Sequence, residues 1–305
     1  MSEPTATALS VVIPAYNEEG AIAEVLRDLA AALPDAEVIV VNDGSKDGTL
    51  AAATAAVASL PNVRVFSHRF NRGYGASLKT GMSRATGEYV AWFDADAEHR
   101  TTDLKAMFEK VSGERLAAVI GVRTSKSTTR VRGAGKWLIR LLTVALGIPY
   151  VSDLNCGLRI FRRGTIVGYL SLLPDRYSAS MTTTILMLER GYPIAFHPIQ
   201  TNARVGHSKV RTIDGFRALT KVIQLITLFA PMRLFFRPGL VAVALGLVYG
   251  IVLTVLQREG FPTASLLLTL GGMLLCILGL IADQISQMRL ETRASDDNVI
   301  ESRMP

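Results

Sequence analysis

Residues 87–100, GEYVAWFDADAEHR, place acidic side chains directly after an apolar segment. Asp94 and Asp96 are one residue apart, and Glu98 follows at the same spacing. One interpretation is a solvated turn, because aspartate is common where strands end. The other is a cation site, since two carboxylates at this spacing can present oxygens to a hard cation such as Mg²⁺ or Mn²⁺. Such a cation would neutralise the diphosphate of a bound nucleotide.

The segments before this cluster alternate between strand and helix patterns. Strands are expected within 9–17, 37–45, 63–68 and 88–94, and helices near 19–33, 49–59 and 76–85. This alternation predicts an α/β fold with a mostly parallel sheet and helices on both faces. In such sheets, ligands gather at the carboxyl ends of the strands. Three strands end in PAYNEE, NDGSKDGT and DADAEH, so acidic and amide groups converge on one edge, which argues against the solvated turn.

Two common nucleotide-binding patterns are absent from the sequence. The segment NRGYGASLKTG has Gly73 and Gly75 but lacks the third glycine of a dinucleotide fingerprint, and it does not open the first strand–helix unit. No phosphate loop ending in Gly-Lys-Ser or Gly-Lys-Thr occurs. A metal-bound nucleotide diphosphate therefore fits the acidic edge better than a dinucleotide does.

The composition indicates a membrane-associated chain. Its 305 residues are 49% hydrophobic, with a mean hydropathy of +0.30, which is too apolar for an ordinary soluble protein of this length. Residues 238–257 and 261–282 carry no charge, and each is long enough to cross a bilayer as a helix. The alternative is a pair of buried core helices. Two such segments joined by a short linker favour a transmembrane hairpin.

Basic residues predict the orientation of this hairpin. Residues 204–237 contain seven lysines and arginines against one acid, Asp214, and Arg289 and Arg293 follow the second span. Positive charge accumulates on the cytoplasmic side of membranes. We therefore expect both termini, and the domain before the hairpin, to lie on the cytoplasmic side of a cytoplasmic (inner or plasma) membrane.

Five motifs occur in order: VVIPAYNEE, VVNDGSKDGT, NRGYGASLKTG, DADAEH and LNCGLRIF. Together they resemble family 2 glycosyltransferases of the GT-A fold, in the branch of dolichol-phosphate mannose synthase and the bacterial polyprenyl-phosphate glycosyltransferases. The resemblance covers residues 8–215, and the hairpin is similar to the membrane anchor of the bacterial members. It implies the following organisation: a Rossmann-like GT-A domain at 1–212, interfacial amphipathic helices at 213–237, spans at 238–257 and 261–282, and a cytoplasmic tail at 283–305.

The resemblance also implies the donor site, residue by residue. It assigns the nucleotide sugar to Pro14, Ala15, Tyr16, Glu18, Asp43, Lys79, Asp94, Ala95, Asp96, Arg204 and Lys209. Asp43 would hold the edge of the base, although an Asx-turn with Gly44 and Ser45 would explain the same residue, and Lys79 would equally suit a surface charge. Asp96, with Asp94 and Glu98, would hold Mg²⁺ or Mn²⁺. Glu98 replaces the glutamine that is common in the mannose synthases and adds a negative charge.

The acceptor site is expected in the basic segment 123–140, which has six lysines and arginines and no acid. An apolar segment follows this basic segment. The pattern predicts a membrane-surface element, and the alternative is a solvated helix. The resemblance assigns the lipid phosphate to Arg123, then to Arg130 or Arg132, and to Ser208 in RVGHSKVR. Asp153 would be a base or an organiser of the acceptor site, or merely a turn or helix-cap residue.

These assignments lead to a hypothesis for the reaction. A phosphate monoester, with a second pKa of about 6, is largely a dianion at neutral pH and needs no strong base to attack. The leading hypothesis is inverting transfer of a hexose from UDP-glucose or GDP-mannose to polyprenyl (undecaprenyl or dolichyl) phosphate, with Asp94, Asp96, Asp153 and Arg123 as catalytic residues.

Two alternatives are a polysaccharide-extending transferase, whose Gln-x-x-Arg-Trp motif the sequence lacks, and an inactive membrane-anchored scaffold of the same fold. Beyond donor and acceptor, the expected partners are membrane lipids, with no nucleic acid. Gly246 and Gly250 also suit a helix contact within a homo-oligomer.

Overall fold

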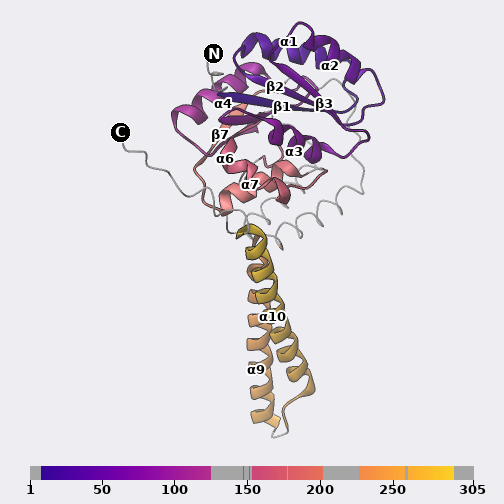
Figure 1. The fold of residues 1–305 in the computed structure, drawn as a ribbon. Helices are drawn as coiled ribbons and strands as arrows, with labels where there is room; N and C mark the ends of the chain where they lie inside the picture. Colours follow the sequence, from indigo (N-terminus) through magenta and orange to yellow (C-terminus); the bar gives the residue numbers. More distant parts are fainter. Residues whose placement is uncertain are drawn as a thin grey trace. The chain divides into compact units, whose positions relative to one another are not determined.

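The computed structural model describes residues 8–124, 147, 151, 153–176, 178–201, 227, 229–257 and 260–291 (Figure 1). The chain divides into two compact units. The first, here called the sheet unit, comprises Met1–Thr129 and Val151–Lys209. The second, here called the hairpin unit, comprises Arg130–Tyr150 and Val210–Pro305.

A seven-stranded sheet forms the centre of the sheet unit. Its strands are β1 (Leu9–Ala15), β2 (Glu37–Asn42), β3 (Val63–Ser67), β4 (Tyr89–Trp92), β5 (Ala118–Arg123), β6 (Arg159–Arg162) and β7 (Ile194–Ile199). Their order is β3-β2-β1-β4-β6-β5-β7. All pairs are parallel except those of β6, which runs antiparallel to both β4 and β5. The predicted mostly parallel α/β sheet is confirmed.

Helices cover both faces of this sheet. They are α1 (Ile22–Ala32), α2 (Thr49–Val57), α3 (Tyr74–Arg84), α4 (Thr101–Gly113), α6 (Arg163–Val167) and α7 (Ala179–Glu189), with a short 3₁₀ helix η1 (Leu170–Leu172). Val11 and Ile13 of β1 pack in the core beneath α1 and α4, whereas Val12 packs beneath α3 and α7, because successive strand residues point to opposite faces. Figure 1 shows α1 and α2 on one side of the sheet and α3 and α7 on the other.

Two helices start at a different residue from the sequence-based expectation. The first helix begins at Ile22 rather than Glu19, because the carbonyl of Glu18 accepts hydrogen bonds from Ala21 and Ile22 and closes a turn there. The helix expected from residue 76 begins at Tyr74, directly after Gly73, whose φ of 107° suits glycine. This earlier start places Tyr74 on the helix that faces the carboxyl edge of β4.

A fully buried arginine joins three elements of the sheet unit. Arg159, on β6, donates hydrogen bonds to the backbone carbonyls of Leu154, Cys156 and Ser180 and to the hydroxyls of two α7 threonines, Thr183 and Thr184. Its guanidinium also lies 5.9 Å from the centre of the Trp92 ring, on β4. Burial lowers the pKa of Arg159 to about 10, so the side chain keeps its charge at neutral pH.

Replacement of Arg159 should therefore destabilise the sheet unit strongly. We expect Arg159→Leu to lower the free energy of unfolding by about 3 kcal/mol or more, because five buried acceptors lose their donor. Arg162→Leu, three residues along the same chain, removes only a solvent-exposed pair with Glu88 and should cost less than about 0.5 kcal/mol. Denaturation in detergent, followed by tryptophan fluorescence, measures both. Equal midpoints for the two variants would contradict the structural role of Arg159.

The hairpin unit contains two long apolar helices, α9 (Arg237–Gln257) and α10 (Thr263–Glu291), and a π-helical turn η2 (Met232–Phe236) runs directly into α9. Segments Met232–Leu256 and Thr263–Met288 are long and apolar enough to span a membrane. In the most apolar 18-residue stretch of each segment, only 17% is buried. This low burial favours a lipid-facing hairpin over a pair of core helices.

Glycines allow α9 and α10 to approach closely. A Cβ on Gly239 would lie 2.7 Å from the carbonyl of Gly272, and one on Gly246 would lie 2.9 Å from the amide of Thr269. α10 continues to Glu291, past residue 283 where the tail is expected to start, and Ser286 within it is buried. Most of the amphipathic segment expected at 213–237 lies outside the described residues.

Candidate functional site

Three loops meet at the carboxyl edge of β1, β2 and β4. The amide of Asp43 donates to the carbonyl of Ala15 at 2.8 Å, so β1 and β2 end side by side. Beyond the strands, the amide of Asn17 donates to Ser45 Oγ at 3.1 Å, and the amide of Glu18 donates to Thr49 Oγ1 at 2.8 Å. The predicted donor residues that end β1 thus share an edge with those that end β2.

Asp94, which follows β4, is held by two side chains. The hydroxyl of Tyr74 donates to its Oδ1 at 2.9 Å, and Nε2 of His99 lies 3.2 Å from its Oδ2. Burial alone would raise the pKa of Asp94, but the hydrogen bond and charge of His99, followed by the hydrogen bond from Tyr74, lower it overall. Asp94 is therefore ionised at neutral pH and held in one orientation.

The pKa values of Tyr74 and His99 are shifted in the direction that keeps their protons available to Asp94. Burial, with the nearby charge of Asp94, raises the pKa of Tyr74 well above its usual value, so its hydroxyl stays protonated and donates. Burial alone would lower the pKa of His99, but its contact with Asp94 raises it overall. The other ring nitrogen of His99 is buried without a hydrogen-bond partner. Sequence reasoning assigned no role to either residue, although both lie inside quoted motifs, NRGYG and DADAEH.

Gly157 brings the LNCGLRIF segment against Asp94. A Cβ at this position would lie 2.2 Å from Oδ2 of Asp94. Only glycine allows such an approach without displacing the carboxylate. The loop that contains Asp153 and Asn155 is thereby held beside the predicted donor site.

Arg123 and Asp153 form a two-pronged ion pair. Nε and Nη2 of Arg123 donate to the two carboxylate oxygens of Asp153 at 2.8 and 3.1 Å, and Nη1 lies 3.6 Å from Glu98. Burial alone would raise the pKa of Asp153, but the hydrogen bonds and charge of Arg123 lower it overall. Donating these hydrogen bonds to Asp153 in turn raises the pKa of Arg123. Asp153 is thus a weak base and a strong anchor for Arg123.

Asp96 and Glu98 supply the oxygens that a cation would use. Asp96 is buried, and one of its oxygens accepts the amide of Glu98 at 3.1 Å. Among the described residues, no group of three or more His, Cys, Asp or Glu side chains forms a complete metal cage. Mg²⁺ commonly uses one or two protein carboxylates and completes its shell with substrate phosphate and water. The donor set therefore fits a cation that binds together with a diphosphate.

Asp43 holds a neighbouring loop. Its Oδ1 accepts the amide of Arg72 at 2.9 Å and lies 2.8 Å from Nδ1 of His68, and its Oδ2 accepts the amide of Gly73 at 2.8 Å. His68 in turn contacts Thr80 Oγ1 at 3.0 Å. The amide of Ser45, which an Asx-turn at Asp43 would use, instead donates to Oδ1 of Asn42 at 3.3 Å.

The remaining predicted residues lie in several settings. Lys79 pairs with Asp175 and donates to the carbonyl of Leu173 at 3.1 Å, so it is not a free surface charge. Ala15 and Ala95 are buried, and Tyr16 lies at the exposed rim. The other predicted phosphate contacts lie outside the described residues; they are Arg130, Arg132, Arg204, Ser208 and Lys209.

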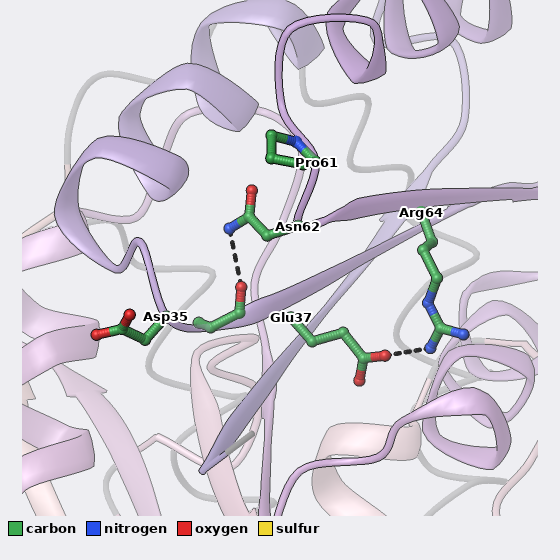
Figure 2. Close-up of a pocket in the computed structure, with 6 residues that line it drawn as sticks. Asp35, Glu37, Pro61, Asn62 and Arg64 are labelled. Carbon is green, nitrogen blue, oxygen red and sulfur yellow. Dashed lines mark hydrogen bonds and ion pairs between the residues drawn. The ribbon is translucent and has the colours of Figure 1, made fainter. Parts of the chain in front are cut away.

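A shallow pocket of about 230 Å³ lies elsewhere in the sheet unit (Figure 2). It is lined by Asp35, Ala36, Glu37, Pro61, Asn62 and Arg64. These residues surround the amino end of β2, the opposite end from Asp43. Three of its polar side chains are already paired, since Arg64 forms an ion pair with Glu37 and Asn62 donates to the carbonyl of Ala36 at 2.9 Å. The pocket is therefore separate from the acidic edge.

Comparison with known proteins decides the family. Residues 10–166 match glycosyl transferase family 2, which is about half of the chain. The chain belongs to this family. Residues 230–288 match the family described as the GtrB C-terminal hairpin. The carboxylates at the edge of β4 thus lie in a glycosyltransferase domain, and the hairpin unit matches a second family model.

Two relatives match this glycosyltransferase over almost its whole length. A bactoprenol glucosyl transferase from Shigella phage SfX is 27% identical, over 97% of this chain and 99% of the relative. An undecaprenyl-phosphate 4-deoxy-4-formamido-L-arabinose transferase from Aeromonas hydrophila is 27% identical, over 94% and 90%. The structure of glucosyl-3-phosphoglycerate synthase from Mycobacterium tuberculosis, in complex with Mn²⁺, UDP-glucose and phosphoglyceric acid, has a TM-score of 0.56. It covers 72% of this chain and 79% of that chain, is 21% identical, and shows the shared fold.

The contact of Gly157 with Asp94 gives a direct test of the site. We expect Gly157→Ala to reduce sugar transfer at least tenfold, because the new methyl group must push Asp94 out of place. Gly164→Ala is the matched control, since its methyl group would meet nothing within 4 Å. Initial rates and thermal midpoints of both variants are compared. Unchanged rates in Gly157→Ala would show that the position of Asp94 does not limit the reaction.

Proposed function

We propose that this glycosyltransferase moves a hexose from a nucleotide diphosphate sugar to a polyprenyl phosphate at the cytoplasmic face of a membrane, with inversion at the anomeric carbon. The observation that carries the proposal is the match to bactoprenol glucosyl transferase, which extends across both the sheet unit and the hairpin unit. UDP-glucose is the first donor to consider and GDP-mannose the second. The acceptor is undecaprenyl or dolichyl phosphate.

The donor half of the site would act through carboxylates whose orientation is set by hydrogen bonds. Asp96, with Asp94 and Glu98, would hold Mg²⁺ or Mn²⁺, which supplies positive charge to the departing nucleoside diphosphate. Tyr74 and His99 keep Asp94 oriented and ionised. Because these hydrogen bonds hold Asp94 in place, the site needs little reorganisation during the reaction.

The acceptor half would act by positioning a nucleophile that is already charged. An oxygen of the lipid phosphate attacks the anomeric carbon while the bond from that carbon to the nucleoside diphosphate breaks. No proton has to leave the nucleophile, since the monoester is largely a dianion at neutral pH. Arg123, anchored by Asp153, would receive this phosphate. Arg130, Arg132 and Ser208 are proposed as further acceptor contacts, and Arg204 and Lys209 as donor contacts.

The hairpin would keep the enzyme at the surface where its lipid acceptor lies. Its two apolar helices support membrane anchoring, and the basic residues in 204–237 support a cytoplasmic orientation. Residues 213–237 would lie in the interface as amphipathic helices. Self-association through the glycine-containing helices is part of the same proposal.

A transfer assay tests the reaction. Purified protein is mixed with Mg²⁺ or Mn²⁺, a short polyprenyl phosphate and radiolabelled UDP-glucose, GDP-mannose or UDP-N-acetylglucosamine, and label in the organic phase is counted. We expect label from one donor, and a loss of about 100-fold or more in Asp96→Asn, because the charge that binds the cation is removed. Asp28→Asn, an exposed residue of α1, is the control. Equal labelling by both variants would contradict the role of Asp96.

The pH dependence tests the absence of a general base. Asp153 has a lowered pKa, so it stays ionised from neutral pH down to below its usual range. We expect the rate to fall as pH drops through about 6, because the acceptor phosphate becomes a monoanion. Asp153→Asn should lower the rate through misplacement of Arg123 yet keep this acidic limb, measured as kcat/KM for the acceptor. Disappearance of the limb in Asp153→Asn would identify Asp153 as the base instead.

A further inference from the structure

An arginine at the start of the first apolar segment has a buried nitrogen without a partner. The segment Met232–Leu256 is long and apolar enough to span a membrane, and Arg233 is its second residue. In the described part of the hairpin unit, Nη1 of Arg233 is buried and has no hydrogen-bond partner. A buried donor that is left unpaired costs free energy, and it costs more when the group is charged. The residue as a whole is only partly buried, so a ligand can reach its guanidinium group.

A glycine makes room for this guanidinium group. A Cβ on Gly147 would overlap Nη1 of Arg233 and would lie 2.9 Å from its Cζ. Gly147 also has a φ of +64°, a left-handed conformation that favours glycine. The contact with Gly147 therefore covers Nη1 without pairing it.

The backbone that carries Arg233 adopts an unusual turn. η2 is π-helical, and the amide of Arg237 donates to the carbonyl of Met232, five residues earlier. α10 packs closely against this turn, since a Cβ on Gly279 would lie 2.9 Å from the amide of Phe236. π-helical turns are rare and often occur at functional sites. The position of Arg233 is thus set by a turn that α10 and Gly147 both contact.

The length of the apolar segment would place Arg233 at the level of the lipid headgroups. The segment has 25 residues. As a helix it is about 37 Å long, against about 30 Å for a hydrocarbon core, so its ends would lie beyond the apolar region. The anionic groups at that level are the phosphates of the bilayer lipids. The planar guanidinium group of arginine matches the geometry of phosphate oxygens.

We propose that Arg233 is a binding site for the phosphate of a bilayer phospholipid, and that a phosphate oxygen accepts the hydrogen bond that Nη1 lacks. The inference rests on the membrane anchoring in the proposed function. It concerns a lipid that is not consumed, so the site differs from Arg123, which is proposed to receive the acceptor. Phospholipids would surround the end of the segment, whereas the acceptor phosphate must reach a sugar donor bound in the sheet unit. The bound phosphate would fix the depth of α9 in the membrane.

Lipid retention by the full chain tests the site. Protein in detergent is titrated with phosphatidylglycerol, and bound lipid is counted by native mass spectrometry. Arg233→Gln should weaken retention of the first lipid about 10-fold or more, because charged donors to the phosphate are lost. Arg237→Gln removes the same charge from an exposed residue four positions along, and its retention should stay within about twofold of the wild type. Equal losses in both variants would show only a general attraction between basic residues and lipid, and would overturn the site.

A pair of glycine variants tests the geometry. Gly147→Ala must displace the guanidinium group of Arg233 and should weaken retention of phosphatidylglycerol about threefold or more. Gly260→Ala is the matched control, since its methyl group would meet nothing within 4 Å. Thermal midpoints show whether each variant is folded. Wild-type retention in Gly147→Ala and in the Arg233 variant would contradict the inference.

A conservative variant covers the case in which Arg233→Gln does not fold. Arg233→Lys keeps the charge, but a single ammonium group cannot reproduce the planar fork, so retention should fall about threefold or more. Diacylglycerol, which has no phosphate, should bind wild type and variants alike. A loss of diacylglycerol as large as the loss of phosphatidylglycerol would indicate an apolar contact in place of a phosphate site.

Further outcomes separate this inference from the proposed function. Arg233→Gln should leave the KM for polyprenyl phosphate unchanged in the transfer assay. A raised KM together with unchanged retention of phosphatidylglycerol would assign Arg233 to the acceptor and overturn the inference. A wild-type protein that shows the expected lipid pattern but transfers no sugar would overturn the proposed reaction and support this inference. Release of the wild type from membranes by alkaline washing would overturn the anchoring on which both depend.

Discussion

The fully buried charge of Arg159 is the constraint on which the arrangement of the site depends. Placing a guanidinium in the interior costs several kcal/mol unless its donors are satisfied. The acceptors that satisfy it belong to α7 and to Leu154 and Cys156, in the loop that follows Asp153. That loop therefore cannot move without exposing unpaired groups. Because the same loop carries Gly157 against Asp94, the position of the proposed donor carboxylate is tied to the position of the proposed acceptor anchor.

Charged groups around this fixed loop are paired with one another. Asp94 is stabilised by Tyr74 and His99, and Asp153 by Arg123, so each carboxylate carries its charge at neutral pH. A site built on carboxylates with lowered pKa values, here Asp94 and Asp153, is poorly suited to removing a proton. It suits a nucleophile that arrives ionised, and a phosphate monoester is such a nucleophile.

The sequence predicted the sheet, its flanking helices and the acidic edge, because strand and helix periods and motif order are local properties. It also named Arg123 and Asp153 as residues of one site. It could not predict that they bind each other, since they lie 30 residues apart and meet only through the pairing of β5 with β6. The burial of Arg159 could not be predicted either, because an arginine in a strand pattern is normally expected to be exposed. The same limit applies to Asp43, whose three partners come from a loop about 25 to 30 residues away.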